Sequence, residues 1–476
     1  MKLPDSVSYI IGKLETRGFE AFAVGGCVRD AMLGREPEDW DITTSARPEE
    51  IKEVFPKTID TGIQHGTVTV MIDHVGYEVT TYRIDGEYED GRHPKEVSFT
   101  TNLRMDLERR DFTINAMAYN DSTGLVDEFD GIGDLQRKII RCVGDAGHRF
   151  DEDALRMLRA VRFSGQLGFM IEDQTRQAIV ERAFHLKKIS AERIRVELVK
   201  LLVSQGAGQL RIAYETGMTG VFLPELDHMM VCKQKNPHHI YTVGEHSIRG
   251  IERMNDFFDR KKREQLTMLS PVTREWIGAF CDSLTKKQHI MLVVTMLLHD
   301  IAKPEVMQLD ENGIGHFLGH SEKSEKTALQ IMKRLTFDND TIHIVKRLIR
   351  WHDYRMEATQ KAVRKAAAKI GKDIIWMEFL VQYADILAQN PATFPEKLEK
   401  TDRAAEIYRQ IEEEAHPLTL KDLAVNGGDL IKEGIEPGPK LGVVLKQLLE
   451  LVLEEPERNS RKFLLEQVQK INRMDL

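Results

Sequence analysis

Residues 23–42, AVGGCVRDAMLGREPEDWDI, constrain the fold more than any other stretch of this chain. An apolar run over residues 22–24 ends at the paired Gly25 and Gly26, and a helix-like stretch carrying Arg29 follows. This order predicts a strand, a tight turn and the start of a helix. Glycines let the backbone approach a ligand closely, and a helix N-terminus presents free N–H groups to a phosphate. The stretch therefore predicts an α/β domain with an anion-binding turn.

Two carboxylates follow this helix, Asp39 and Asp41, separated only by Trp40. On a strand the side-chain period is two, so both would face the same way. Mg²⁺ prefers such carboxylates together with substrate phosphates. The pair could activate a 3′-hydroxyl and neutralise a triphosphate during an in-line displacement. From the residues alone, a solvated loop remains the alternative.

In this order and spacing, with Arg29 and Asp30 between them, the glycine pair and the DWD run resemble the polymerase-beta-like nucleotidyltransferase superfamily. GGCVRD followed by DWDI resembles the class II branch, which holds bacterial tRNA CCA-adding enzymes and poly(A) polymerases. The resemblance implies that Asp39 and Asp41 are catalytic and hold Mg²⁺. It also implies that Gly25, Gly26 and Arg29 bind the nucleotide.

Bulk composition is that of a multidomain globular protein. At 476 residues the chain is too long for one core, and its length suggests about three domains. The net charge of −9 argues against a uniformly basic nucleic-acid binder. It leaves room for a local basic groove, because phosphate binding depends on nearby Lys and Arg side chains.

The sequence predicts a cytoplasmic protein with no membrane partner. Its four cysteines lie far apart without a CxxC pair, as expected for free thiols in a reducing compartment. The opening MKLPDSVSYI lacks the apolar core of a signal peptide. The longest apolar run, residues 290–298, is shorter than the ~20 residues of a membrane helix and predicts a buried helix instead.

Two strands, HGTVTVMI and GYEVTTYRI, are predicted around the turn Asp73-His74. Glu78 lies at the centre of the second strand, where a charged residue is depleted unless it has a partner. A solvent-facing side chain is one interpretation. EVTTYR also matches the family pattern in which a carboxylate on the neighbouring strand completes the metal site, which implies that Glu78 is a third catalytic carboxylate.

Two further stretches of the head resemble family motifs. IDGEYEDGRHPKE, residues 84–96, is rich in glycine and charge and predicts a mobile loop; it resembles the flexible loop that accompanies addition of the terminal A. In ERRDFTINAMAY, Arg110 is by chemistry alone a phosphate ligand or a salt-bridge partner. The run resembles the family's RRDFTxNA motif, which implies that Arg110, Asp111 and Asn115 bind the incoming nucleotide.

Residues 150–169, FDEDALRMLRAVRFSGQLGF, have helical periodicity, which puts Asp153 and Arg156 on one face. An intrahelical ion pair is the plain interpretation. EDALRMLRAVRF, however, resembles the motif in which an Asp and an Arg serve as an amino-acid template. Arg159 and Arg162 extend the basic face. They could bind the nucleotide by steering its phosphates, or they could only solvate the helix.

The template interpretation agrees with hydrogen-bonding chemistry. Cytosine and adenine both present an amine donor beside a ring-nitrogen acceptor. A carboxylate accepts from the amine, and a guanidinium donates to the ring nitrogen. Guanine and uracil present the reverse order and would leave buried partners unpaired, which can discriminate by about 10⁴-fold. The pair therefore predicts that CTP and ATP are accepted.

Farther along, five His- and Asp-containing segments fall in helical text: HHIYTVGEHSI, LLHDIAKP, FLGHSEKS, IRWHDYR and YADILAQN. An adjacent His–Asp pair at the end of an apolar run needs a compensating partner, and a metal supplies one. The set resembles the HD phosphohydrolase superfamily, which implies a divalent metal, of unspecified identity, that activates water for phosphoester hydrolysis. His316 is an alternative to His320. The implied ligands are His246, His299, Asp300, His320, His352 and Asp385.

These motifs predict an α/β polymerase-beta-like nucleotidyltransferase head followed by an all-α neck, body, HD domain and tail. The expected parts are a head (1–145), a helical neck and body that binds RNA and the nucleobase (146–234), an HD domain (235–395) and a tail (396–476). In the tail, GIEPGPKLG resembles the helical element that grips the tRNA elbow. A plain helical packing element is equally compatible with it.

The resemblance implies template-independent addition of C, C and A to the 3′ end of tRNA, from CTP and ATP, with a second HD phosphohydrolase activity. A poly(A) polymerase or an A-adding enzyme would share every catalytic residue. From another class, an HD phosphohydrolase with an inactive nucleotide-binding head is the rival, and a non-catalytic RNA-binding scaffold ranks last. No protein partner is implied.

Overall fold

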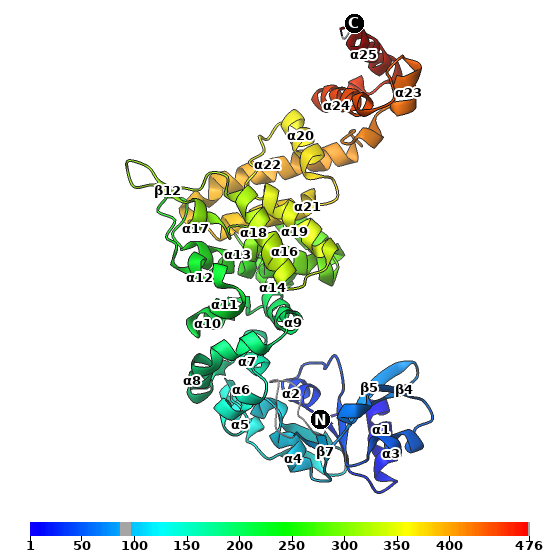
Figure 1. Cartoon of the computed structure of the whole chain (residues 1–476), viewed down its shortest axis with the longest axis vertical. Coiled ribbons are helices and arrows are strands. Elements are labelled where there is room, and N and C mark those ends of the chain that lie inside the picture. Colours follow the sequence, from blue (N-terminus) through cyan, green and yellow to red (C-terminus); the bar gives the residue numbers. More distant parts are fainter. Residues whose placement is uncertain (86–96, 475–476) are drawn as a thin grey trace. The chain divides into compact units, whose positions relative to one another are not determined.

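A computed structural model of the chain describes residues 1–85 and 97–474. These residues divide into two compact units, Met1–Pro224 and Glu225–Leu476 (Figure 1). The finer four-part division stays a prediction. Of the loop predicted at 84–96, residues 86–96 lie outside the described residues, while Ile84 belongs to a short strand.

The first unit is built on a seven-stranded mixed sheet of order β3-β4-β5-β2-β1-β8-β9. Strands β2 and β5 pair in parallel, and the other neighbours are antiparallel. Asp73 and His74 have φ values of 48° and 67°. Two left-handed residues are what a tight type I′ hairpin turn needs, so the predicted β4–β5 hairpin is confirmed. The strands are β1 (Ala21–Val24), β2 (Ile42–Thr44), β3 (Thr58–Gly62), β4 (Thr67–Ile72), β5 (Val75–Thr81), β8 (Met117–Asn120) and β9 (Gly124–Asp127).

Short helices and a second strand pair complete the head. Helix α1 has four buried apolar residues, which recur at helical spacing along one face. Helix α3 begins with Pro48 at its first position, where the missing N–H of proline costs nothing. The helices are α1 (Asp5–Glu15), α2 (Gly26–Met32), α3 (Pro48–Val54), α4 (Leu103–Glu108) and α5 (Gly131–Arg137), and β6 (Arg83–Asp85) pairs with β7 (Val97–Phe99).

The rest of the first unit is mostly helical, and it corrects one expectation. A single helix over residues 150–169 is wrong, because the chain breaks at Asp153, whose φ and ψ are −143° and 101°. The Asp153 carboxylate accepts a hydrogen bond from the Leu155 N–H at 3.0 Å. Short acidic side chains favour such positions because they satisfy the free N–H groups of a helix start. The elements are α6 (Ala146–Glu152), α7 (Leu155–Leu167), α8 (Asp173–Arg182), α9 (Ala191–Leu202), α10 (Leu210–Glu215), α11 (Thr219–Phe222) and the paired β10 (Ile139–Ile140) and β11 (Met170–Ile171).

In the second unit, α16 (Lys286–Leu298) forms the centre of a helical bundle and packs against α13, α19 and α21. Residues 291–298 are all buried, so the predicted buried helix is confirmed. Across the described ranges, no helix is long and apolar enough to cross a bilayer. Around α16 lie α12 (Pro224–Val231), α13 (Val243–Phe258), α14 (Arg260–Glu264), α15 (Pro271–Ser283), α17 (Lys303–Val306), α18 (His320–Arg334), α19 (Asn339–Trp351), α20 (Gln360–Ile370), α21 (Ile375–Leu387), α22 (Phe394–Glu413) and the pair β12 (Gln308–Leu309) and β13 (Gly315–His316).

The last helices, α23 (Gly427–Lys432), α24 (Pro439–Glu454) and α25 (Arg461–Met474), share a small apolar core of their own. Arg364 on α20 donates to the backbone oxygens of Leu453 and Glu454 at 2.8 and 2.9 Å. A guanidinium there satisfies carbonyls that a helix C-terminus leaves without partners. The overall class, an α/β head followed by helices, is therefore as predicted.

Candidate nucleotide and metal sites

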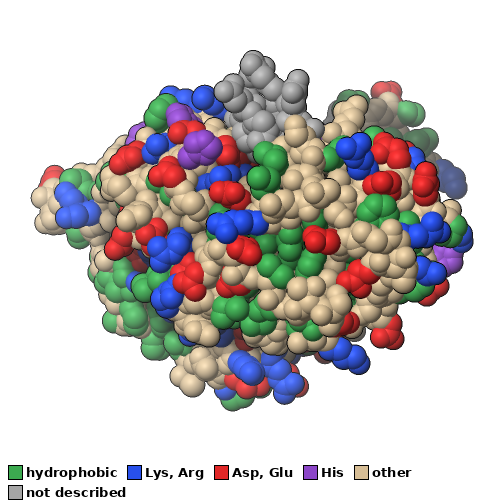
Figure 2. All heavy atoms as spheres, turned by 90° about the horizontal axis from the view of Figure 1, so that it is seen from below, with side chains coloured by type: hydrophobic (Ala, Val, Ile, Leu, Met, Phe, Trp, Pro, Cys, Tyr) green, Lys and Arg blue, Asp and Glu red, His purple; other side chains and the backbone are tan. Residues whose placement is uncertain are grey.

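A cavity of about 790 Å³ lies in the first unit. Its wall is formed by residues from the glycine turn, the segment before β2, the stretch after α4, and helix α7. Ten predicted site residues line it: Gly25, Gly26, Arg29, Asp39, Asp41, Arg110, Asp111, Asn115, Arg159 and Arg162. On the face shown in Figure 2, Lys and Arg side chains are mixed with Asp and Glu.

The turn before α2 requires glycine at one position. Gly25 has φ 82° and ψ −129°, a region that side chains with a Cβ rarely enter. A Cβ on Gly25 would also lie only 2.9 Å from Nη1 of Arg110. Because Gly25 has no side chain, the Arg110 guanidinium has room beside the turn, in the wall of the cavity.

The three predicted carboxylates lie at neighbouring places on the sheet. Strand β2 begins at Ile42, so Asp39 and Asp41 come just before it, although the Val24 N–H still donates to the Asp41 carbonyl at 3.0 Å. Ile42 is in register with Val79 of β5, which puts Glu78 beside Asp41.

The electrostatics of these carboxylates fit a cation. Partial burial, then Asp41 and Asp39, raise the pKa of Glu78. The pKa of Asp41 is also raised by burial and by Asp39, although Arg110 opposes the shift. Crowded anions of this kind are stabilised by a divalent cation, and carboxylate oxygens are the ligands that Mg²⁺ prefers.

A continuous polar network crosses the cavity wall. Arg29 pairs with both carboxylate oxygens of Asp30 at 2.9 and 2.8 Å and donates to Oδ1 of Asn115 at 2.7 Å. Asn115 donates to Asp111 at 3.0 Å, and Asp111 accepts from Nε and Nη2 of Arg159 at 2.8 and 2.6 Å. Burial raises the pKa of Asp111, but Arg159 and Asn115 more than offset this, so the pKa is about 2. Asp111 therefore stays ionised and holds Arg159 in place.

Phe163 is a site residue that the sequence interpretation missed. The guanidinium carbons of Arg29, Arg159 and Arg162 lie 5.0, 5.3 and 3.8 Å from the centre of its ring. Such cation–π contacts stabilise closely spaced cations. The available signal was its spacing, four residues after Arg159 and next to Arg162. Glu197, which pairs with Arg162 from α9, gave no signal because its partner is 35 residues away.

The predicted template residues, Asp153 and Arg156, are not among the residues that line this cavity, and the Arg156 N–H donates to the Asp153 carbonyl at 3.0 Å. The break before α7 turns Asp153 toward Arg193, whose Nη2 lies 2.7 Å from Oδ2. Arg156 pairs with Glu152 and donates to the carbonyl of Arg109 at 3.0 Å. The charged partners of these two side chains are therefore Arg193 and Glu152, and the template role stays a prediction.

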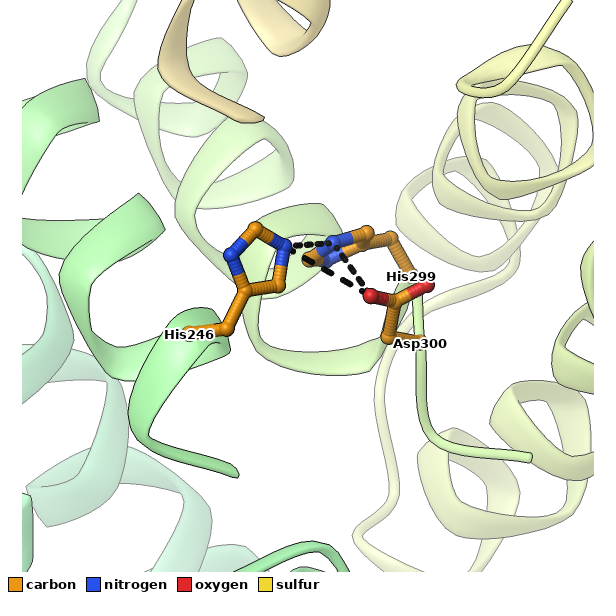
Figure 3. Close-up of side chains that lie close together, drawn as sticks. All are labelled: His246, His299 and Asp300. Carbon is orange, nitrogen blue, oxygen red and sulfur yellow. Dashed lines mark hydrogen bonds and ion pairs between the residues drawn. The ribbon is translucent and has the colours of Figure 1, made fainter. Parts of the chain in front are cut away.

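The second unit gathers all six predicted HD residues into one buried cluster, from helices that are far apart in the sequence. Figure 3 shows His246 of α13 turned toward His299 and Asp300 at the end of α16. The Nε2 atoms of His246 and His299 are 3.3 Å apart. Those of His320 and His352 are 3.2 Å apart. Asp385 completes the set, with Oδ1 3.0 Å from Nε2 of His246.

The structure also distinguishes His320 from its alternative. His320 is buried at the start of α18 and faces the cluster. His316 is exposed on β13, and its Nε2 lies 2.9 Å from Asp310. The cluster therefore contains His320.

Hydrogen bonds fix the tautomer of each histidine in the cluster. A backbone carbonyl can only accept, so each Nδ1 must carry the proton, and in the neutral ring Nε2 keeps a lone pair. Donation from the outer ring nitrogen to a backbone carbonyl is typical of metal-ligating histidines. The Nδ1 partners are Ala388 O for His246 (3.2 Å), Met296 O for His299 (2.9 Å), Phe317 O for His320 (2.8 Å) and Ile349 O for His352 (2.7 Å).

Asp300 is fully buried at the centre of the cluster. Its Oδ2 is 3.2 Å from Nε2 of His299 and 3.5 Å from that of His246, while its Oδ1 is 3.5 Å from both His320 and His352. Two groups of three ligands therefore share this carboxylate. Each group has the imidazole and carboxylate donors that suit a divalent transition metal.

Three neighbours of the cluster were not predicted: Lys303, Gln389 and His239. Lys303 is buried, with Nζ 2.7 Å from Oδ2 of Asp300. Gln389 donates to Oδ2 of Asp385 at 2.7 Å. In the sequence, Lys303 follows Asp300 by three residues and Gln389 follows Asp385 by four, which are spacings that bring side chains together on a helix. The ring of His239 meets His246 edge-on at 5.2 Å, and burial lowers its pKa to about 2, so it is neutral.

The glycine turn, the three adjacent carboxylates and the arginine-lined cavity, carried on this mixed sheet, define a polymerase-beta-like nucleotidyltransferase head. Family models agree along the chain. They match the poly A polymerase head domain over residues 21–141, the RNA and SrmB-binding site of polymerase A over 168–230 and tRNA nucleotidyltransferase domain 2 over 307–468.

Comparison with individual proteins narrows the class. The chain is 36% identical to the CCA-adding enzyme of Leuconostoc mesenteroides over 442 residues, which is 92% of this chain and 89% of that enzyme. It is 56% identical to that of Lactobacillus delbrueckii subsp. bulgaricus over 200 residues, 42% of this chain and only half the length of that relative. The solved Bacillus stearothermophilus CCA-adding enzyme in complex with CTP matches with a TM-score of 0.68 and 28% identity, over 100% of this chain and 99% of that one. The chain belongs to the family of CCA-adding enzymes.

Proposed function

We propose that this protein adds C, C and A to the 3′ end of tRNA, using CTP and ATP, in the cytoplasm. The observation that carries the proposal is the cavity of the first unit, where Asp39, Asp41 and five arginines meet beside Glu78. A triphosphate needs both features, cations around its oxygens and carboxylates that hold a divalent metal near the reacting phosphorus.

In the proposed reaction, the 3′-oxygen of the tRNA attacks the α-phosphorus of the bound nucleotide. A new O3′–P bond forms, the bond to the β-phosphate oxygen breaks, and pyrophosphate leaves. Asp39, Asp41 and Glu78 would hold Mg²⁺, which when bound supplies charge neutralisation and polarises the phosphate. Arg29, Arg110, Arg159 and Arg162 would orient the phosphate oxygens, and the 3′-hydroxyl proton passes to a carboxylate or to water.

Asp153 and Arg156 are proposed to select the base. Each already makes a charged contact, with Arg193 and Glu152. A guanidinium has five N–H donors and a carboxylate about four acceptor sites, so each can add a bond to a base without losing its present partner. Selection on this basis favours CTP and ATP over GTP and UTP.

Primer extension tests this proposal against its alternatives. The substrates are tRNA transcripts that end before CCA, after C and after CC, each with CTP, ATP or both. Completion of CCA followed by a stop is the expected result. Long A tails on any RNA would identify a poly(A) polymerase, and A addition to the CC-ended transcript alone would identify an A-adding enzyme. No incorporation would leave only the hydrolase in the second unit.

For the second unit we propose metal-dependent hydrolysis of phosphoesters. The supporting observation is that four histidines direct their Nε2 atoms toward Asp300 and Asp385 beside a cavity of about 440 Å³. A water oxygen attacks the phosphorus, the ester P–O bond breaks, and the alcohol leaves with a proton. A bound divalent metal supplies the activated water. Phosphate release with Mn²⁺, Ni²⁺, Zn²⁺ or Mg²⁺ tests the activity and identifies the metal.

A further inference from the structure

The cavity at the buried His–Asp cluster adjoins a second cavity within the same unit. The first, about 440 Å³, is lined by His320, His352 and Asp385 of the cluster. The second, about 380 Å³, lies against α22 and includes Lys397. Arg355 and His238 line both. Arg355 is therefore within reach of a ligand bound in either cavity.

Two cations of the second cavity are linked to the metal-ligand candidate Asp385, Arg355 by a direct contact and Lys397 through Gln389. Nη2 of Arg355, a half-exposed side chain, lies 3.7 Å from Oδ2 of Asp385. Lys397 donates to the side-chain oxygen of Gln389, whose amide donates to the same Asp385 oxygen at 2.7 Å. Arg355 thus lies next to Asp385, and Lys397 lies one side chain farther from it.

Positive charge at this wall is only partly neutralised. Lys400 pairs with Glu396 at 2.7 Å, and Asp353 lies 2.9 Å from Arg355. For Lys397 the acceptor is the neutral amide of Gln389. Burial lowers the pKa of Lys397, and Arg355 and Lys303 lower it further, while the Asp385 and Asp353 carboxylates oppose the shift. The pKa of His238 is lowered by burial, by Lys397 and by Arg355, with Glu396 opposing. An anion bound between Arg355 and Lys397 would relieve this repulsion.

We propose that Arg355 and Lys397 bind a second phosphate group of the molecule that is hydrolysed at the His–Asp cluster. This inference rests on the hydrolase proposed above and names its substrate class: a compound with two phosphate groups. A guanidinium fork and a point-like ammonium are both established phosphate ligands. A free nucleoside bisphosphate and an RNA 3′ end with a terminal phosphate share this chemistry.

Binding measurements on the full Mn²⁺-loaded chain test the proposal directly. Calorimetry would compare adenosine 3′,5′-bisphosphate with adenosine 3′-monophosphate on the wild type, Arg355→Gln and Lys397→Gln. The wild type should bind the bisphosphate about tenfold more tightly, since a charged hydrogen bond contributes about that factor. Each variant should lose this preference and keep its affinity for the monophosphate. Binding in the head is common to all variants and cancels in the comparison.

Lys333→Gln, an exposed charge change on α18, is the matched control and should behave as the wild type. Arg355→Lys should recover part of the preference, because it restores the charge but not the fork. Equal wild-type affinity for the two nucleotides would overturn the proposal. So would a parallel loss of monophosphate binding in the variants, since the residues would then act on the metal cluster itself.

A second arm distinguishes the two sources of substrate and separates this inference from the hydrolase. An RNA trinucleotide ending in a 3′-phosphate is compared with the free bisphosphate in binding and in phosphate release. Dependence on Arg355 and Lys397 for either compound supports the second-phosphate site and identifies the source, while dependence for neither overturns it. If the variants show the expected binding but no phosphoester is cleaved, the proposed hydrolase activity is wrong and the proposed second-phosphate site is supported.

Discussion

The two candidate sites are built in opposite ways. The head site is an open cavity with exposed carboxylates, and its charged groups come mostly from short continuous motifs. The His–Asp cluster is buried, and each of its histidines is oriented by a backbone carbonyl. An open site suits substrates that enter and leave in succession. A buried site of fixed geometry suits a metal ion that stays bound. The substrate can then bind only at the coordination positions that the protein ligands leave open.

The largest expected effect separates the two sites by function. Asp39→Ala should lower nucleotide addition by about 10³-fold, because a lost metal ligand removes several kcal/mol of transition-state stabilisation. Stability should change little, since Asp39 is exposed. Phosphoester hydrolysis should be unaffected. Primer extension, thermal unfolding and phosphate release measure the three properties.

The matched control for this prediction is Glu53→Ala, which removes an exposed carboxylate from α3. It should leave all three properties unchanged. Retained nucleotide addition in Asp39→Ala would contradict the assignment of this carboxylate as a metal ligand.

Asp300→Asn should produce the reverse pattern. Hydrolysis and metal binding in the second unit should be lost, while CCA addition persists. The substitution leaves Lys303 buried without its carboxylate partner, so the free energy of unfolding should fall by about 3 kcal/mol. Metal content by elemental analysis and urea unfolding provide the measurements.

Asp310→Asn serves as the comparison, because it removes a carboxylate from an exposed Asp–His pair in the same unit. It should change stability by less than about 1 kcal/mol. If Asp300→Asn keeps its full metal content, the shared-ligand interpretation of Asp300 is wrong.

Asp111 tests the contrast between an open and a buried site, because it is a buried carboxylate within the otherwise open head site. Its pKa of about 2 is below the value near 4 of an unfolded chain. The ionised form thus stabilises the fold above pH 4, by roughly 2 kcal/mol, and this stabilisation is lost as the pH falls through 2. Urea unfolding of wild type and Asp111→Asn should differ by that amount at pH 7 and converge near pH 2. A constant difference across this range would refute the assignment to Asp111.

The head could be anticipated from the sequence because its motifs are local. The glycine turn, the DWD run and RRDFTINA each place several site residues within a few positions, and the β4–β5 hairpin followed from its turn. The His–Asp cluster was anticipated only as a set, through resemblance. The pairing of its two groups through Asp300 depends on helices brought together in three dimensions.

What the sequence did not predict has particular physical causes. The break at Asp153 arises because an aspartate can either continue a helix or cap the next one, and the periodicity of the apolar residues is the same in both cases. The partners Arg193 and Glu197 come from α9, about 35 to 40 residues away. Charge pairs at such separations carry no signature in a single sequence.

The smallest expected effect concerns the backbone of the open site. Gly25→Ala puts a Cβ at φ 82° and 2.9 Å from Arg110, which should cost about 1–2 kcal/mol of stability. Gly12→Ala on α1, where a Cβ meets nothing within 4 Å, should instead stabilise the protein by about 0.5–1 kcal/mol. Because the new methyl group also displaces Arg110, Gly25→Ala should slow nucleotide addition about tenfold while hydrolysis continues unchanged. Equal stability changes for the two variants would mean that the turn tolerates a side chain at Gly25. The head site would then not depend on the close approach between the Gly25 backbone and Arg110.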